Sequence, residues 1–154
     1  RPRRSGGRRP AASPPRGGDG RGGENQQERK VKTMNESELL VRAFLRRCGI
    51  RPHLKGFRAL SCALELALDD RTYLDGITKR LYPDVALCLQ ITPQTVERQM
   101  RYAIEQALDV YGTEVMQKAL GYAPRLRSGK YSNREFLTEA LDAIIAQRDY
   151  GEVF

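Results

Sequence analysis

The segment that follows Pro93 carries polar side chains whose types and spacing suit hydrogen bonding to the edges of DNA base pairs. At a period of 3.6 residues they share one face of a helix, opposite an apolar stripe. Arginine can donate two parallel bonds to guanine, glutamine can pair with adenine, glutamate can accept from cytosine, and threonine can touch the thymine methyl. We therefore predict a base-reading helix. The candidate DNA-binding residues are Gln94, Thr95, Glu97, Arg98, Arg101, Tyr102 and Lys130.

The same face could also be an ordinary solvated surface, with Glu97 and Arg101 paired one turn apart for a few tenths of a kcal/mol. The neighbouring elements favour the DNA interpretation. A short helix from Pro83 to Gln90, a turn closed by Ile91, and a helix capped by Thr92 have the dimensions of a helix-turn-helix. Burial of an apolar stripe would then turn the polar face outward. That stripe is Val96, Met100, Ala103, Ile104 and Ala107.

Helical periodicity extends over the rest of the chain, and no segment alternates with a period of two. Glycines and prolines mark most of the boundaries. The fold class is predicted to be all-α, a six-helix bundle containing a helix-turn-helix. The expected helical segments are Asn35 to about Gly49, Pro52–Asp69, Thr72–Leu81, Pro83–Gln90, Pro93–Tyr111, Thr113–Leu120, and a last helix from the Ser132 cap.

The positive charge is concentrated at the N-terminus. Residues 1–33 hold ten Lys/Arg and three Asp/Glu, which accounts for +7 of the formal net charge of +8. They contain almost no apolar residues, so burial cannot offset the entropy cost of ordering them. We expect a disordered Arg/Gly/Pro-rich tail over residues 1–33 and a nearly neutral helical effector domain over residues 34–154.

Met34 opens the patterned region, and residues 22–30 can be encoded by purine-rich codons, as in a ribosome-binding leader. We hypothesise that Met34 is the natural start. No stretch reaches the roughly 18 to 20 consecutive apolar residues of a membrane helix, so we expect a cytoplasmic protein with no membrane partner.

Residues suited to catalysis or metal binding are sparse. The three cysteines, Cys48, Cys62 and Cys88, are widely and unequally spaced, and His53 is the single histidine. Cys62 and Cys88 are interpreted as small buried hydrophobes. Metal sites and acyl-transfer sites draw on clusters of such groups. We expect no enzyme activity, no cofactor and no metal.

Several motifs then point to one family. The stretches that carry the likeness are Arg51–Phe57, Ile77–Pro83, Val96–Arg98 with Arg101, Ala103–Glu105, Gly121-Tyr122 and Ser132–Phe136. In this order and spacing they resemble the C-terminal effector domain of the sporulation master response regulators of endospore-forming bacteria. The resemblance covers about Glu38 to Arg148.

The resemblance implies a six-helix domain that binds a short asymmetric box in promoter DNA, often as a tandem pair. It also implies DNA contacts at Glu97, Arg98 and Arg101. The family carries an arginine where this chain has Thr95, so the target box is expected to differ. Residues 1–33 cannot form the family's receiver domain, so the chain is interpreted as an excised effector domain or as a stand-alone relative regulated by abundance or by a partner.

The predicted partner is double-stranded promoter DNA, with a second copy on tandem sites and RNA polymerase as further candidates. Lys130, at the end of a basic loop, is expected to touch DNA phosphates. A different class of function is also open: a helical protein-interaction module that binds a partner regulator and has lost specific DNA reading. The near-neutral charge of residues 34–154 favours that alternative.

Overall fold

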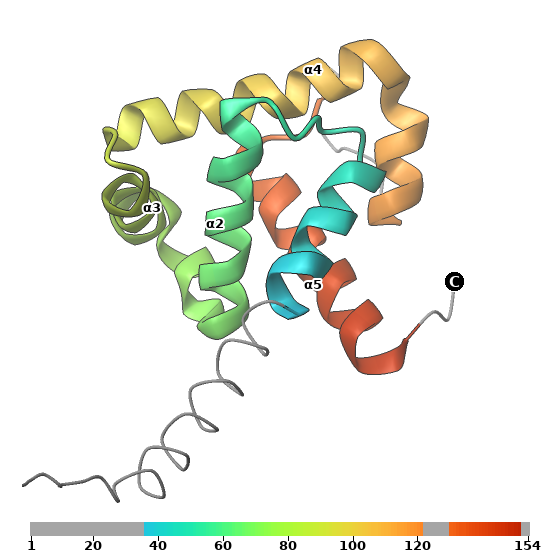
Figure 1. Cartoon of the computed structure of the whole chain (residues 1–154), viewed down its shortest axis with the longest axis horizontal. Coiled ribbons are helices and arrows are strands. Elements are labelled where there is room, and N and C mark those ends of the chain that lie inside the picture. The colour runs from blue at the N-terminus through green and yellow to red at the C-terminus, as the bar shows by residue number, and fades with distance from the viewer. Residues whose placement is uncertain (1–35, 122–129, 152–154) are drawn as a thin grey trace, which may run out of the picture. The chain divides into compact units, whose positions relative to one another are not determined.

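A computed structural model describes residues 36–121 and 130–151 of the chain, and these residues form helices joined by short turns (Figure 1). No strand occurs in the described ranges, which confirms the all-α prediction. The residues group into two compact units, Arg1–Glu36 and Ser37–Phe154. Nearly all of the first unit lies outside the described residues, and with it the predicted tail. The helical elements are a first helix over residues 36–47, α2 (Lys55–Asp69), a 3-10 helix (Arg71–Gly76), a π-helix (Ile77–Leu81), α3 (Tyr82–Leu89), α4 (Pro93–Leu120) and α5 (Asn133–Tyr150).

The described part contains five α-helical elements, whereas a six-helix bundle was predicted and seven helical segments were expected. The expected segment Thr72–Leu81 is instead covered by the 3-10 helix and the π-helix. Two other expected segments meet at Gly112 in the single element α4. Gly112 has φ 79° and ψ 172°, a non-helical conformation that the absence of a Cβ permits, so α4 consists of two helical arms that meet in a kink at the predicted boundary. Figure 1 shows the second arm, in orange, turning away from the long first arm.

Two helix boundaries differ from the predictions because prolines do not set them. The second helix was expected to begin at Pro52, but α2 begins at Lys55. Residues 51–54 form a turn instead, in which the Leu54 amide donates to the Arg51 carbonyl at 3.2 Å. A break was expected before Pro83, but the π-helix runs directly into α3. Pro83 lies in the first turn of α3, where a missing N–H costs little.

The apolar faces of the helices form the core. The burial of one face of α4 confirms the phase that was predicted for this helix. The five side chains of the predicted inward stripe, Val96 to Ala107, are all buried.

The prediction that Cys62 and Cys88 are small buried hydrophobes is wrong. Cys62 is only partly buried and Cys88 is exposed, because Cys88 lies on the outer side of the short helix α3.

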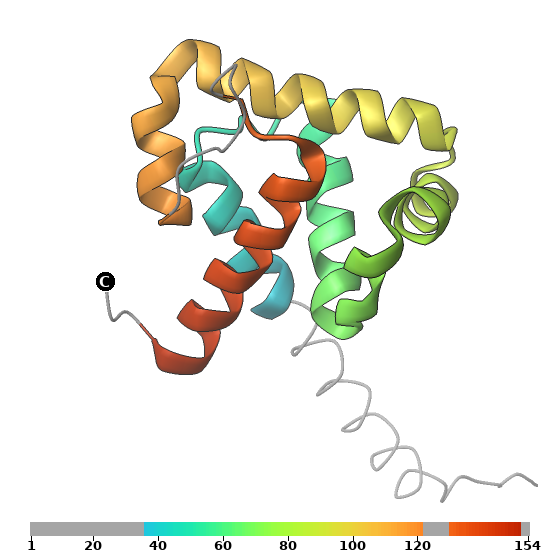
Figure 2. The same cartoon turned by 180° about the vertical axis from the view of Figure 1, so that it is seen from behind.

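The first arm of α4 lies across the ends of the other helices, as Figure 1 and the reverse view in Figure 2 both show. α2, α3 and α5 all pack against it. The outer side of α4, which faces away from these three helices, is therefore exposed to solvent. Within the described ranges, none of the helices combines the length and the apolar character that crossing a bilayer demands.

Candidate nucleic-acid interface

α3, the turn at residues 90–92 and the start of α4 form a helix-turn-helix, as predicted. α3 ends at Leu89, and its C-cap residue Gln90 adopts the left-handed conformation with φ 60° and ψ 45°. The Ile91 amide then donates to the Ala86 carbonyl at 3.0 Å, which closes the turn. Thr92 caps α4 by accepting from the Thr95 amide at 3.1 Å, and Pro93 occupies the first turn. These contacts fix the position of the first turn of α4 relative to α3.

The predicted base-reading residues lie on the outer face of α4. Gln94, Arg98, Arg101 and Tyr102 are exposed, while Glu97 is partly exposed. Within the described residues Arg98 has no ion-pair partner, whereas Arg101 pairs with Glu97 one turn earlier. The Arg98 guanidinium is therefore available for contacts outside the protein. The Arg101 guanidinium is already bound to the Glu97 carboxylate.

Asn133 joins the helix-turn-helix to α5, a role that the sequence analysis did not foresee. The Ser132 side chain caps α5 by accepting from the Glu135 amide at 3.1 Å, as predicted. The next residue, Asn133, is buried, and its Nδ2 donates to the Tyr82 hydroxyl and to the Glu97 carbonyl, each at 3.0 Å. Burial raises the pKa of Tyr82 despite this bond, so its hydroxyl stays protonated at neutral pH. One side chain thus contacts both helices of the motif.

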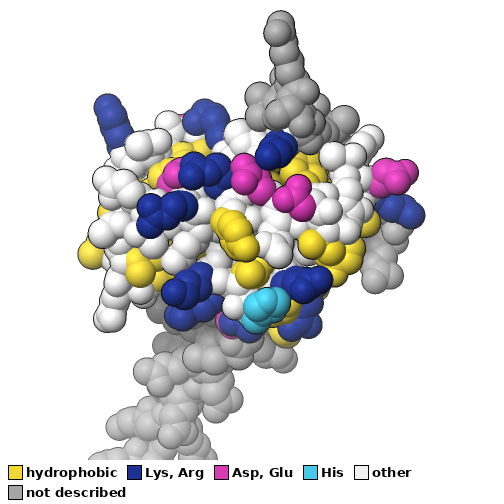
Figure 3. All heavy atoms as spheres, turned by 90° about the horizontal axis from the view of Figure 1, so that it is seen from above, with side chains coloured by type: hydrophobic (Ala, Val, Ile, Leu, Met, Phe, Trp, Pro, Cys, Tyr) yellow, Lys and Arg dark blue, Asp and Glu magenta, His cyan; other side chains and the backbone are white. Residues whose placement is uncertain are grey.

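Gly56, near the start of α2, allows that helix to approach α4 closely. A Cβ placed at Gly56 would lie 2.2 Å from the carbonyl oxygen of Gln99 and 2.5 Å from the Cβ of Ala103. The N-terminal end of α2 therefore packs directly against the backbone of α4. Figure 3, which views the outer face of α4, shows basic side chains and the histidine gathered on it, with acidic side chains between them. Arg51, His53 and Lys55 are all exposed.

The comparison with protein families agrees with this geometry. A family model described as "Sporulation initiation factor Spo0A C terminal" matches residues 41–144. The chain belongs to this family. It is therefore a DNA-binding effector domain of the sporulation-regulator type, and the Spo0A C-terminal family is not an enzyme family. The matched range lies within the stretch over which the sequence resemblance was recognised.

Thr95 is the position at which the chain departs from the expected pattern of the Spo0A C-terminal family. It is partly buried, and its hydroxyl lies 2.7 Å from that of Thr92. The Thr95 hydroxyl is thus bound within the helix cap.

The basic loop that was predicted to touch DNA lies mostly outside the described residues. Lys130, its last basic residue, is described and exposed. Its neighbour Tyr131 is buried and anchors the return of the chain to α5.

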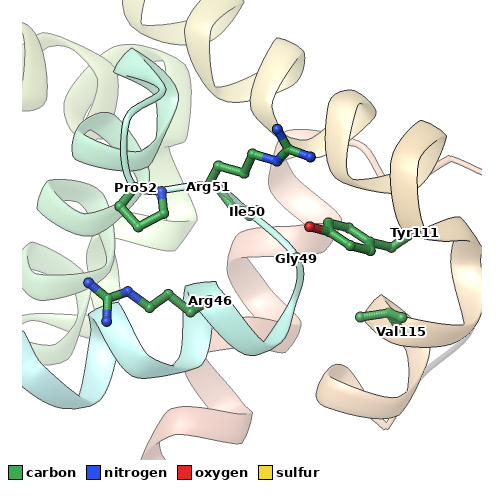
Figure 4. A pocket seen from close by; sticks show the side chains of 7 residues that line it. All are labelled: Arg46, Gly49, Ile50, Arg51, Pro52, Tyr111 and Val115. Carbon is green, nitrogen blue, oxygen red and sulfur yellow. The ribbon is translucent and has the colours of Figure 1, made fainter.

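A separate surface feature lies at the kink of α4. An open pocket of about 340 Å³ forms between the end of the first helix and the second arm of α4 (Figure 4). In the figure, the ring of Tyr111 lies against Gly49, and the guanidinium groups of Arg46 and Arg51 point away from each other. Two of the pocket's lining residues, Tyr111 and Val115, are exposed, so this is a partly apolar surface. The lining residues are Arg46, Gly49, Ile50, Arg51, Pro52, Tyr111 and Val115.

Proposed function

We propose that this protein is a sequence-specific transcription regulator that reads promoter DNA by placing the first turns of α4 in the major groove. The observation that carries the proposal is the position of Arg98. It is exposed and unpaired within the described residues, on a helix whose opposite face is fully buried. A guanidinium in that position can bind the O6 and N7 atoms of guanine together, which is the commonest specific contact in the major groove.

The neighbouring side chains have complementary roles. Gln94 pairs with adenine, and the methyl of Thr95 touches thymine, since its hydroxyl is bound to Thr92. Glu97 accepts from cytosine N4. Arg101 exchanges its bond to Glu97 for a DNA phosphate, which leaves the Glu97 carboxylate free for the base.

Phosphate contacts on both sides of α4 fix the register of the helix in the groove. Tyr102 and Lys130 are exposed and supply such contacts beside Arg101. His53, in the turn before α2, and Lys55, the first residue of α2, supply them from the end of α2 that packs against α4. Phosphate bonds of this kind give affinity and orientation but carry no sequence information of their own.

The same proposal includes a role for the N-terminal segment, a cellular location and the partners of the domain. Residues 1–33, with ten Lys/Arg and three Asp/Glu, add nonspecific affinity to the reading domain of residues 34–154. The regulator works in the cytoplasm, on tandem sites that a second copy occupies, and contacts RNA polymerase when bound at a promoter.

A protein-interaction module is the second candidate function, and a specific surface favours it. Tyr111 and Val115 are exposed in the lining of the pocket at the kink of α4. Apolar side chains gathered on a surface are typical of protein-docking sites. In a regulator that reads DNA, the same surface would serve a partner bound at the promoter.

A mobility-shift experiment with the full chain separates the two functions. The protein is titrated against genomic promoter fragments and against random DNA of equal length at moderate salt. We expect a subset of promoters to bind at least ten-fold more tightly than random DNA, since specific binding typically exceeds nonspecific binding by about 10³ or more. Equal affinity for all fragments would refute base reading and favour the interaction module.

A further inference from the structure

The pocket at the kink of α4 is lined by segments that are far apart in the sequence. One side comes from the turn that follows the first helix, and the other from residues on both sides of Gly112 (Figure 4). Ile50, which is buried, and the exposed side chains of Tyr111 and Val115 supply apolar lining. The pocket is open and has a volume of about 340 Å³.

The Tyr111 ring is held in place by its contact with Gly49. Gly49 has φ +91°, and a Cβ at this position would lie only 2.8 Å from Cδ2 of Tyr111, so the ring packs directly on the glycine backbone. The Tyr111 side chain nevertheless remains 47% exposed. This part of the pocket is therefore formed before a partner arrives, which lowers the entropy cost of binding.

The charged residues that line the pocket are two arginines, and no acidic residue belongs to the lining. Arg46 and Arg51 are both exposed, and their guanidinium groups are separated from each other (Figure 4). Within residues 36–121 and 130–151 neither guanidinium has an ion pair or a side-chain hydrogen bond, whereas the neighbouring Arg47 donates to Gln147 at 3.1 Å. Two free positive charges beside an apolar surface are complementary to carboxylates beside an apolar side chain.

We propose that this pocket binds an acidic segment of a partner protein. One aromatic or aliphatic side chain of the segment packs against Tyr111 and Val115. Its carboxylates bind the guanidinium groups of Arg46 and Arg51. The proposal gives a partner chemistry to the protein-interaction surface, so it rests on that second candidate function and does not depend on base reading by α4.

The shape and lining of the pocket favour a protein segment over other anionic ligands. A small-molecule site encloses most of its ligand, whereas an open pocket covers only one side of what it binds. DNA phosphates are the other anions that two free arginines can bind, but phosphate contacts do not require apolar side chains. Exposed apolar side chains with polar residues around them are typical of protein-interaction sites.

The test measures the binding of fluorescein-labelled synthetic peptides to the full chain by fluorescence polarisation, at about 0.15 M salt. Each probe has a central Phe, Leu or Ile between two Asp-Glu pairs, and the matched peptides have a central Ser or have Lys in place of the acidic residues. We expect the apolar-centred acidic peptides to bind at least about five-fold more tightly than the Ser-centred peptide, since part of an apolar side chain is buried. Residues 1–33 carry +7 in every sample, and this attraction for acidic peptides does not depend on the central side chain.

Substitutions in the lining should weaken this binding. Arg46→Ala and Arg51→Ala should each weaken it by about two- to five-fold, the range expected for one exposed ion pair. Lys118→Ala is the matched control, because it removes the same charge from an exposed position of α4 outside the lining and should have a smaller effect.

Added negative charge provides a second comparison. Val115→Glu should weaken binding of the acidic peptides by more than about ten-fold through repulsion, and Gln117→Glu places the same charge outside the lining as its control. The double variant Arg46→Glu/Arg51→Glu should bind the lysine-flanked peptides more tightly than the parent does. Melting temperatures of all variants report whether they are folded.

The same proteins are titrated with promoter fragments and random DNA, so that the two functions fail separately. Absence of promoter discrimination in the parent refutes base reading and leaves the pocket untouched, whereas equal binding of Ser-centred and apolar-centred peptides overturns the pocket proposal alone. The proposal is also overturned if the arginine variants keep peptide affinity but lose affinity for random DNA with a shallower salt dependence, since the arginines then bind phosphates. Sedimentation that shows self-association of the parent, abolished by Val115→Glu, would overturn it in favour of a second copy as the occupant.

Discussion

The Nδ2 atom of Asn133 donates a 3.0 Å hydrogen bond to the main-chain carbonyl of Glu97, so the first residue of α5 is bound to the part of α4 that carries the predicted base-reading side chains. The same nitrogen also bonds to Tyr82 in α3. A single buried amide therefore sets the position of α4 relative to the two elements beside it.

Asn133→Ala should destabilise the fold by about 1 to 3 kcal/mol, because it leaves buried acceptors without their donor. Urea unfolding measures this loss. The neighbouring exposed side chain provides the control, since Arg134→Ala should change the unfolding free energy by no more than about 0.5 kcal/mol. Equal effects of the two substitutions would show that Asn133 does not fix the motif.

Gly56→Ala should destabilise the protein although alanine is the better helix former by about 1 kcal/mol. The added Cβ would overlap the Gln99 carbonyl, and a backbone atom cannot rotate away. We expect a net loss of about 1 to 3 kcal/mol from the forced separation of α2 and α4. Gly76→Ala is the matched control, because its Cβ would meet only the Arg80 Cβ at an ordinary 3.6 Å. A stabilised Gly56→Ala variant would contradict the close approach of the two helices.

The contrast between these positions shows what a sequence can predict here. The period of apolar residues is a local property, so it correctly predicted the all-α class, the buried stripe of α4 and the helix-turn-helix. The Thr92 and Ser132 caps were also predicted, because each cap involves residues only three positions apart. The start of α2 was not, since its packing under α4 and the turn after Arg51 override the local preference of Pro52.

Contacts between segments that are far apart in the sequence could not be predicted from local patterns. The bonds of Asn133 to α3 and α4 and the approach of Gly56 to Gln99 depend on how the helices pack. None leaves a spacing pattern in a single sequence. The local signs in the sequence are an asparagine directly after the capping Ser132 and a glycine inside a helical stripe.

Met100→Ala and Ile104→Ala should each reduce the unfolding free energy by about 2 to 5 kcal/mol, since both side chains are fully buried and their truncation leaves a cavity. Tyr102→Ala, on the exposed side of the same helix, is the control and should have a small effect on stability. Denaturant titration of the three variants checks this. Similar losses at all three positions would mean that α4 is rotated from the orientation described.

Deletion of residues 1–33 should preserve a cooperative thermal transition and the ranking of promoter fragments. Because the removed segment carries +7, nonspecific affinity and its dependence on salt should fall. Calorimetry and mobility shifts at several salt concentrations measure both. Loss of the cooperative transition would place the domain boundary elsewhere.

Arg98 and Arg101 lie one turn apart on the exposed face of α4, yet only Arg101 is paired with Glu97 within the described residues. The two side chains should therefore respond differently to removal. Arg98→Ala should leave the melting temperature nearly unchanged, because the side chain is exposed. It should cost about 1 to 3 kcal/mol of binding to the preferred site and relax the preference at one base pair. Competition with single-base variants of that site identifies the base.

Arg101→Ala should instead weaken preferred and random DNA by similar factors and reduce the slope of log affinity against log salt by about one unit, as expected for loss of one phosphate contact. Because the same substitution frees Glu97 from its ion pair, Glu97→Gln in that background is the control for unpaired negative charge near the phosphates. Affinity that returns in the double variant would assign the loss to Glu97 rather than to a missing contact. Should Arg98→Ala bind the preferred site as tightly as the parent, base reading by α4 would be wrong, and the apolar surface around Tyr111 would become the better candidate for the functional site of this domain.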